Sequence, residues 1–279
     1  MSGKSNIHPE MIEIDGVSTA VTHRTGNEPV LLCIHGNSLS QQTYAPLWSD
    51  PRFDNYALIT YDLPGHGKSK RPSNPEKSYC FSGYARHLTA LVTHFGLEKY
   101  IIIGHSLGGH IALQCAVQPG LTGLYGLFLM GTPPLSRLED SQAAFNPLPE
   151  GASFFTGPMT DEGAEFLAAK LDRRKSEQKK LKKILLVSDP EARTNLVKNL
   201  AVSGLKNEKK WIKESKLPSR LLFGENDSLI NFDYIKDPSF QKILGSDRKL
   251  SWLPETEHMP IWDRSPGYAD ELLSFLNNR

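Results

Sequence analysis

The chain has 279 residues, of which 39% are hydrophobic and 23% are charged, and its formal net charge is +1. This composition is typical of a globular protein with a buried core, and it excludes an intrinsically disordered chain. The balance of charges also disfavours a nucleic-acid-binding protein, because no excess of basic residues would attract a polyanion.

Eight short segments of the sequence predict β-strands. The first two, 11–15 and 17–23, flank Asp15-Gly16, a pair that is typical of a type I′ hairpin turn. The other six are continuous apolar runs bounded by turn residues, which is typical of parallel strands buried on both faces. These six runs cover residues 30–34, 57–61, 100–104, 126–130, 220–224 and 249–253.

Helical patterns separate most of these strands. Residues 84–97 carry apolar side chains at helical spacing and end near Gly96, a suitable C-cap. A second helix is predicted over 107–117, directly after the strand at 100–104, and the last helix is expected to begin with Ser265 as its N-cap. Strands alternating with helices predict an α/β fold, a mostly parallel eight-stranded sheet with helices on both faces.

The alternation breaks between residues 132 and 217, where the pattern is helical and rich in lysine. We therefore predict three parts: an N-terminal core over 1–131, a helical cap insertion over 132–217 and a C-terminal core over 218–279. Ser176 is a candidate helix cap, and Ser188-Asp189-Pro190-Glu191 fits a capping box at the start of a helix that Gly204 would end. The basic run at 170–183 is interpreted as a solvated helix face.

A G-x-S-x-G motif covers residues 104–108, with Ser106 at its centre. It follows a predicted strand and precedes a predicted helix, where such a motif forms a tight turn that exposes the serine hydroxyl. The N-terminus of the following helix offers N–H groups to a developing oxyanion. Ser106 is therefore the candidate nucleophile.

A serine hydroxyl needs a base, and the base needs an orienting carboxylate. On this kind of strand–turn–helix nucleophile site the partners follow the serine in the order acid, then histidine. His258, after the last predicted strand, is the candidate base, and Asp227, after the strand at 220–224, is the candidate acid. Glu225 is the nearest rival and is expected to point away, whereas Asp233 is expected in the next helix.

The segment His-Gly-Asn-Ser at 35–38 follows the strand at 30–34. A loop at this place donates the second N–H of an oxyanion hole, so we assign that role to the backbone of Asn37, with the backbone N–H of Leu107 as its partner. The glycines at 65 and 67 lack the spacing of a phosphate-binding loop and are interpreted as a structural turn. Three further histidines are also interpreted as structural: His66, His105 and His110.

The sequence also bounds location and cofactors. Its apolar runs are far shorter than the ~20 residues that span a bilayer, and the first ten residues are polar, so we expect a cytoplasmic protein. Three cysteines without Cys-x-x-Cys spacing do not suit a disulfide scaffold or a zinc site. We expect no metal and no cofactor.

These motifs together resemble the α/β-hydrolase superfamily. The resemblance rests on residues 35–38, 62–69, 104–110 and 224–230 and on the late His258. Within the superfamily, HGNS, DLPGHGKS, GHSLGGHIAL and MGTPP are similar to a bacterial branch that contains N-acyl-homoserine lactonases. This closer resemblance implies that lactone rings are opened through a serine triad, without metal.

We therefore expect a serine hydrolase that cleaves a carboxylic ester or lactone through an acyl-enzyme, with N-acyl-homoserine lactones as candidate substrates. Two alternatives stay open: a C–C bond hydrolase or cofactor-free perhydrolase with the same triad, and a hydrolase-like receptor for a small ligand. The expected partner is a small-molecule ester or lactone, with no nucleic acid and no membrane, and the protein is expected to be a monomer or homodimer. The cap is expected to supply an apolar pocket, with four candidates that also suit the core of the cap: Phe154, Phe155, Met159 and Phe166.

Overall fold

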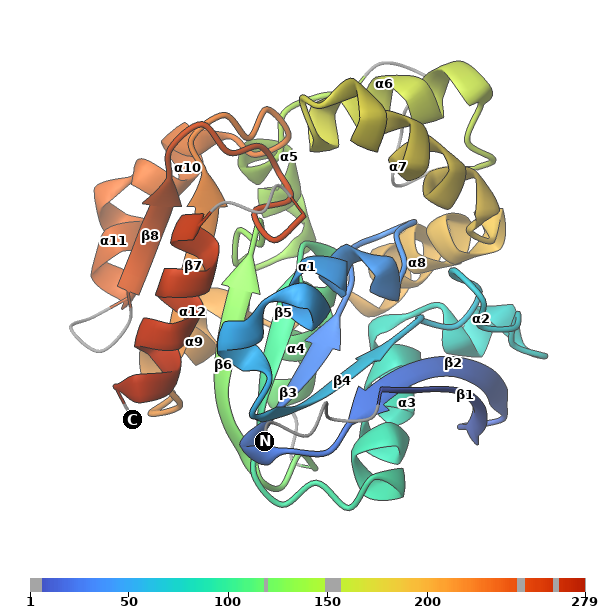
Figure 1. Ribbon diagram of the computed structural model, residues 1–279. Helices are drawn as coiled ribbons and strands as arrows, with labels where there is room; N and C mark the ends of the chain where they lie inside the picture. The colour runs from blue at the N-terminus through green and yellow to red at the C-terminus, as the bar shows by residue number, and fades with distance from the viewer. Residues whose placement is uncertain (1–6, 118–119, 149–156, 245–248, 263–265, 279) are drawn as a thin grey trace.

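The computed structural model describes residues 7–117, 120–148, 157–244, 249–262 and 266–278. Its centre is an eight-stranded sheet in the order β1-β2-β4-β3-β5-β6-β7-β8 (Figure 1). Strand β2 is antiparallel to β1 and β4, and every other neighbouring pair is parallel. The strands are β1 His8–Ile14, β2 Val17–Arg24, β3 Asn27–Ile34, β4 Tyr56–Tyr61, β5 Tyr100–His105, β6 Leu124–Met130, β7 Ser219–Gly224 and β8 Lys249–Leu253. The predicted mostly parallel sheet is confirmed.

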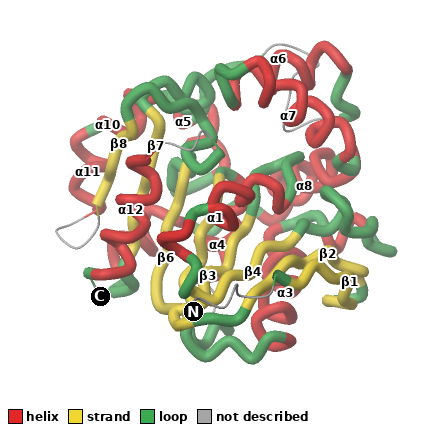
Figure 2. Tube along the Cα trace, in the orientation of Figure 1, coloured by secondary structure: helices red, strands yellow, loops and turns green. Residues whose placement is uncertain are grey.

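The strands are apolar throughout because each face of the sheet is covered. Successive residues of a strand point to opposite faces. In β3, Leu31 and Cys33 belong to the core on one face, whereas Leu32 and Ile34 belong to the core on the other. Figure 2 shows the strands as a central layer between helices.

Two sets of helices form these covering layers. Helices α3 and α4 contribute Leu88 and Ile111 to one core, and α1 and α12 contribute Leu47 and Leu272 to the other. The α-helices of the chain are α1 Ala45–Ser49, α2 Pro75–Ser78, α3 Phe81–His94, α4 Leu107–Ala116, α5 Ser141–Ala144, α6 Asp161–Leu171, α7 Lys175–Val187, α8 Pro190–Ser203, α9 Glu208–Glu214, α10 Phe232–Lys236, α11 Pro238–Leu244 and α12 Pro266–Asn277.

Some predicted boundaries shift. Strand β1 begins at His8 and not at residue 11, because main-chain pairing with β2 continues through polar residues. Helix α3 begins three residues before the predicted start, because the Cys80 side chain accepts a hydrogen bond from Gly83 N–H. Asp15 and Gly16 both have positive φ, 48° and 73°, as the predicted type I′ turn requires.

Helices α5 to α9 lie between β6 and β7 in the chain, and α6 and α7 pack together beyond the carboxyl ends of the parallel strands (Figure 1). Helix α8 ends at Gly204, as predicted, but the predicted capping box on Ser188 is wrong. The N-cap is Asp189, whose carboxylate accepts the N–H of Glu191, whereas the Ser188 hydroxyl donates to the carbonyl of Leu185. The prediction that Ser176 caps a helix is wrong, because α7 already begins at Lys175. Arg174, the residue before it, donates hydrogen bonds to the Asp172 carboxylate. The division at residues 131 and 217 stays a prediction, and Ser265 lies outside the described residues.

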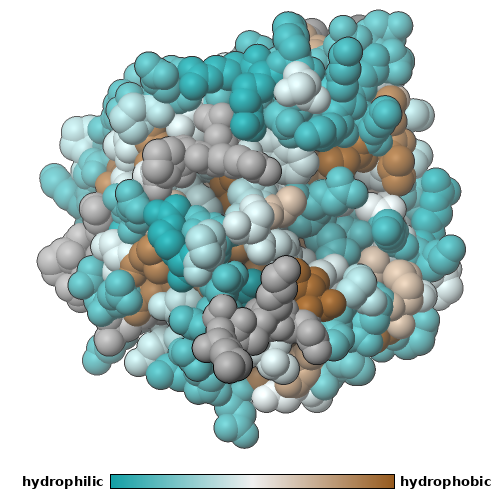
Figure 3. Space-filling model, in the orientation of Figure 1, coloured by the Kyte–Doolittle hydropathy of each residue, from teal (hydrophilic) through white to brown (hydrophobic). Residues whose placement is uncertain are grey.

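The basic run lies mainly on α7. Lys180 forms an ion pair with Glu177, and Lys182 forms ion pairs with Asp161 and Glu165 of α6. The face of the molecule over these helices is predominantly hydrophilic (Figure 3). This arrangement agrees with a solvated helix face. None of the described helices combines the length and the apolar character that crossing a membrane requires.

Candidate active site

Ser106 occupies the turn between β5 and α4, and its backbone is strained. Its φ of 50° and ψ of −116° lie outside the regions that L-residues favour. The turn is possible because the residues two positions before and after the serine, Gly104 and Gly108, lack a Cβ: a Cβ on Gly108 would lie 2.0 Å from the carbonyl oxygen of Ile34. Such a turn places the serine at the N-terminus of α4, where N–H groups and the helix dipole favour negative charge.

Asp227 and His258 come together from the loops after β7 and β8. The Nδ1 atom of His258 lies 2.7 Å from Oδ2 of Asp227, and both side chains are buried. The other carboxylate oxygen, Oδ1, accepts hydrogen bonds from the N–H groups of Leu229 and Ile230, at 2.9 and 3.3 Å. The carboxylate is therefore held in place and accepts a proton-bearing Nδ1, which leaves Nε2 of His258 able to take a proton.

Ser106 and His258 line the same cavity. The hydrogen bonds of the described residues include none between the Ser106 hydroxyl and the His258 ring. Contacts of this kind are often long without substrate and tighten when substrate binds. The two rival carboxylates, Glu225 and Asp233, are exposed and do not line the cavity, and Asp233 lies in α10 as expected.

Asn37 and Leu107 also line the cavity that contains Ser106. Leu107 is the first residue of α4, so its N–H belongs to the helix terminus. The side chain of Asn37 accepts a hydrogen bond from the Ser38 hydroxyl at 3.2 Å, and that hydroxyl accepts one from Arg193 Nη1 at 2.9 Å. Arg193 comes from α8, 155 residues after Ser38, so local sequence patterns held no signal of this contact.

His105, directly before the serine, supports the loop that carries His258. Its Nε2–H donates to the backbone carbonyl of His258 at 2.9 Å, and the two rings meet edge-on with centroids 5.0 Å apart. Burial lowers the pKa of His105 to about 3, so the ring is neutral at ordinary pH. Gly131 packs against the His258 ring: its φ is 57°, and a Cβ at this position would lie 2.9 Å from Cε1 of His258.

The turn at 62–69 is structural, as predicted. Asp62 accepts hydrogen bonds from the backbone N–H groups of Gln41 and Lys68, at 2.6 and 2.8 Å. A Cβ on Gly67 would lie 2.3 Å from the Asp62 carboxylate, which explains the glycine. The described His, Cys, Asp and Glu side chains form no group of three or more that could bind a metal ion.

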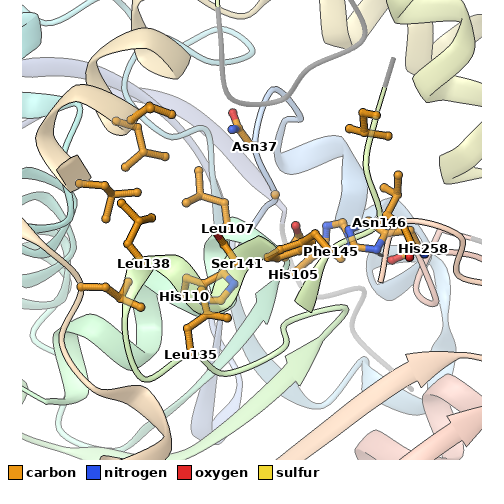
Figure 4. A pocket seen from close by; sticks show the side chains of 18 of the residues that line it. Asn37, His105, Leu107, His110, Leu135, Leu138, Ser141, Phe145, Asn146 and His258 are labelled. Atoms are coloured by element: carbon orange, nitrogen blue, oxygen red, sulfur yellow. Dashed lines mark hydrogen bonds between the residues drawn. The ribbon is translucent and has the colours of Figure 1, made fainter. Parts of the chain in front are cut away.

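The cavity has a volume of about 430 Å³, within the range of small-molecule sites. Figure 4 shows its labelled side chains around His105 and Leu107. Most of its lining is apolar and comes from both core and cap, including Leu39, Phe81, Leu135, Leu138, Phe145, Leu148, Leu171, Leu196, Val197, Leu200, Leu205 and Leu229. Of the four predicted pocket candidates, Met159 is partly buried against the apolar cluster that includes Leu167 and Leu181, and Phe166 is 36% exposed; neither lines the cavity. Phe154 and Phe155 lie outside the described residues.

A family model described as alpha/beta hydrolase fold matches residues 29–217. Among curated proteins, a 2-succinyl-6-hydroxy-2,4-cyclohexadiene-1-carboxylate synthase of Pectobacterium atrosepticum is 35% identical over 107 residues, which is 38% of this chain and 40% of that protein. A proline iminopeptidase of Clostridium botulinum is 30% identical over 118 residues, 42% of this chain and 40% of that protein. The matched stretch thus spans about two fifths of the length of these relatives.

Solved structures match over almost the whole chain. A variant of the N-acyl homoserine lactonase AidH, complexed with N-hexanoyl homoserine, has a TM-score of 0.86 and 24% sequence identity, covering 98% of this chain and 97% of its own. An esterase from Rhodococcus sp. ECU1013 has a TM-score of 0.70 and 19% identity, covering 98% of both chains. At these identities the likeness concerns the fold.

Proposed function

The chain belongs to the alpha/beta hydrolase family, and on that premise we propose that it is a serine hydrolase of carboxylic esters or lactones. One observation carries the proposal: a strained serine and a histidine that is hydrogen-bonded to a buried carboxylate line one largely apolar cavity. These are the groups that acyl transfer requires, and the apolar lining suits an acyl chain.

The proposed mechanism assigns a role to each group. His258 Nε2 takes the proton of Ser106 as the hydroxyl attacks the carbonyl carbon, and Asp227 stabilises the resulting imidazolium. The backbone N–H groups of Asn37 and Leu107 bind the oxyanion of the tetrahedral intermediate. His258 then protonates the leaving alkoxide, and later activates the water that releases the acid from Ser106.

N-acyl-homoserine lactones are the substrates we propose first. The likeness to the AidH complexes supports this choice, together with the HGNS, DLPGHGKS and GHSLGGHIAL segments. The lining of the cavity supports it independently, because an apolar wall accommodates an acyl chain without requiring a charge on the ligand.

A reaction other than ester hydrolysis by the same triad, such as carbon–carbon bond cleavage, is the main alternative. One relative, 35% identical over 107 residues, is a synthase whose named product is a carboxylate. A carboxylated ligand is best bound by Arg or Lys. The described residues that line the cavity include neither. This favours an ester or lactone with an uncharged acyl part.

The test is proton release, measured by pH-stat, on addition of N-acyl-homoserine lactones, with a matched panel of simple carboxylic esters beside them and Ser106→Ala as the control. Lactone turnover well above ester turnover, lost in the variant, is the expected result. Turnover of the esters without turnover of the lactones would mean that the substrate is a linear ester and not a lactone. Binding without any turnover would contradict the hydrolase proposal and favour a receptor.

A further inference from the structure

A second histidine–carboxylate pair borders the same cavity, and the proposed mechanism does not use it. Nδ1 of His110 lies 3.1 and 3.0 Å from the two carboxylate oxygens of Glu208. Glu208 is fully buried, and the His110 side chain lines the cavity. Figure 4 shows His110 near Leu135, on the side of the cavity away from His258.

The other partners of Glu208 fix which atoms of this pair carry protons. One oxygen accepts the backbone N–H of Leu135 at 2.9 Å, and the other accepts the side-chain amide of Gln114 at 2.9 Å. The Gln114 amide cannot be reversed, because its nitrogen donates to the carbonyl of Lys206 and its oxygen accepts the N–H of Lys206, both at 3.0 Å. Each oxygen of Glu208 therefore accepts a hydrogen bond from a fixed N–H donor, as the oxygens of a carboxylate do.

A carboxylate that accepts hydrogen bonds at both oxygens takes a further donor from Nδ1 of His110, which selects the tautomer with its proton on Nδ1. In a neutral ring with a proton on Nδ1, Nε2 is a hydrogen-bond acceptor. None of the described residues hydrogen-bonds to Nε2 of His110.

The position of His110 relative to Ser106 determines which atoms of a bound substrate can contact its side chain. The backbone N–H of His110 donates to the backbone carbonyl of Ser106 at 3.2 Å, so the two residues lie one turn apart at the start of α4. Both residues line the cavity. When the carbonyl carbon of a substrate lies at Ser106, the substrate atoms that are a few bonds from that carbon therefore lie near His110.

We infer that Nε2 of His110, oriented by Glu208, accepts a hydrogen bond from a hydroxyl or N–H group on the acyl part of the substrate, close to the scissile carbonyl. The inference rests on the proposed function, because it takes Ser106 as the reacting atom. It replaces the structural role predicted for His110 with a specificity-determining one. Leu135, beside it, provides apolar contact for the rest of the acyl chain.

The experiment compares ethyl hexanoate with its 2-hydroxy and 3-hydroxy derivatives and with the O-methyl ethers of both, by initial rates in a pH-stat. A methyl ether keeps the oxygen but removes the donor. At one of the two positions, we expect the wild-type protein to prefer the hydroxy ester over its ether by about tenfold in kcat/KM, as one neutral hydrogen bond allows. His110→Phe should reduce that preference to about twofold or less while still cleaving ethyl hexanoate.

The matched control is His87→Phe, which replaces a buried histidine outside the cavity and should keep the wild-type preference. Equal kcat/KM for hydroxy esters and ethers in the wild-type protein would overturn the inference without any variant, as would a preference that survives in His110→Phe. An equal loss of kcat/KM on all five esters in His110→Phe would mean that His110 has only a structural role, which would also overturn the inference. Failure of the proposed function is distinct: no ester, hexanoate included, would then show turnover that depends on Ser106.

Discussion

Replacing Asp227 by Asn should inactivate the protein by reversing the tautomer of His258. The N–H groups of Leu229 and Ile230 bond to Oδ1, so the amide oxygen of an asparagine must occupy that place. Its NH2 group would then face Nδ1 of His258, where the wild-type carboxylate lies at 2.7 Å. Nδ1 would have to accept, and the ring proton would move to Nε2.

A proton on Nε2 prevents the ring from taking the proton of Ser106. Loss of the correct tautomer in a serine triad costs about 10⁴-fold in kcat. At about 1.36 kcal/mol for each factor of ten, this equals about 5 kcal/mol of lost transition-state stabilisation. The fold should persist, because the amide has the shape of the carboxylate and keeps both backbone hydrogen bonds.

The assay is the initial rate of ester hydrolysis in the pH-stat, with the thermal midpoint of each variant as a check on folding. Glu225→Gln and Asp233→Asn remove exposed carboxylates from the same region and serve as controls with wild-type activity. Asp227→Ala imposes no tautomer, so it should lose no more activity than Asp227→Asn. An Asp227→Asn variant with more than about a tenth of wild-type kcat would refute the reasoning, since the tautomer argument requires about 10⁴-fold.

Three further predictions follow from the packing. Gly131→Ala should lower kcat by about tenfold or more, because its Cβ would lie 2.9 Å from Cε1 of His258; unchanged kcat would contradict that contact. Arg193→Met should lower kcat by about tenfold with little change in KM, because the Ser38 hydroxyl in the oxyanion loop loses its hydrogen-bond donor. Arg193→Lys should recover part of the lost kcat, and an effect on KM alone would contradict this role. The free energy of unfolding, measured by urea titration, should fall as pH decreases from 6.5 towards 4. Burial lowers the folded-state pKa of four histidines, so below pH 6.5 the unfolded chain binds protons that the folded chain does not; a flat profile would contradict this. Their folded-state pKa values are about 4 for His35 and His87 and about 3 for His66 and His105.

The sequence predicted the sheet well because its parallel strands are covered on both faces and read as unbroken apolar runs. It also predicted where Ser106, Asp227 and His258 lie, since each follows a strand and the carboxyl ends of parallel strands meet at one edge. Strand β1 was less predictable, because its exposed side chains are set by pairing with β2 and not by burial.

The rest of the site depends on contacts between segments that are distant in the chain. His110 and Glu208 are 98 residues apart, and Arg193 and Ser38 are 155 apart. No local period or spacing reports such pairs. Phe166 is a similar case: its apolar side chain suits a pocket, but the packing of α6 places that side chain at the surface.

The most direct test of the central claim, that Ser106 is the nucleophile, is covalent labelling with an alkyl fluorophosphonate, which phosphonylates an activated serine. The intact protein and its peptides are then analysed by mass spectrometry as activity declines. We expect one phosphonyl group per chain, located on Ser106, with activity lost in proportion to labelling. Full esterase activity in a protein labelled at Ser106, or labelling of another residue that alone accounts for the loss, would contradict it.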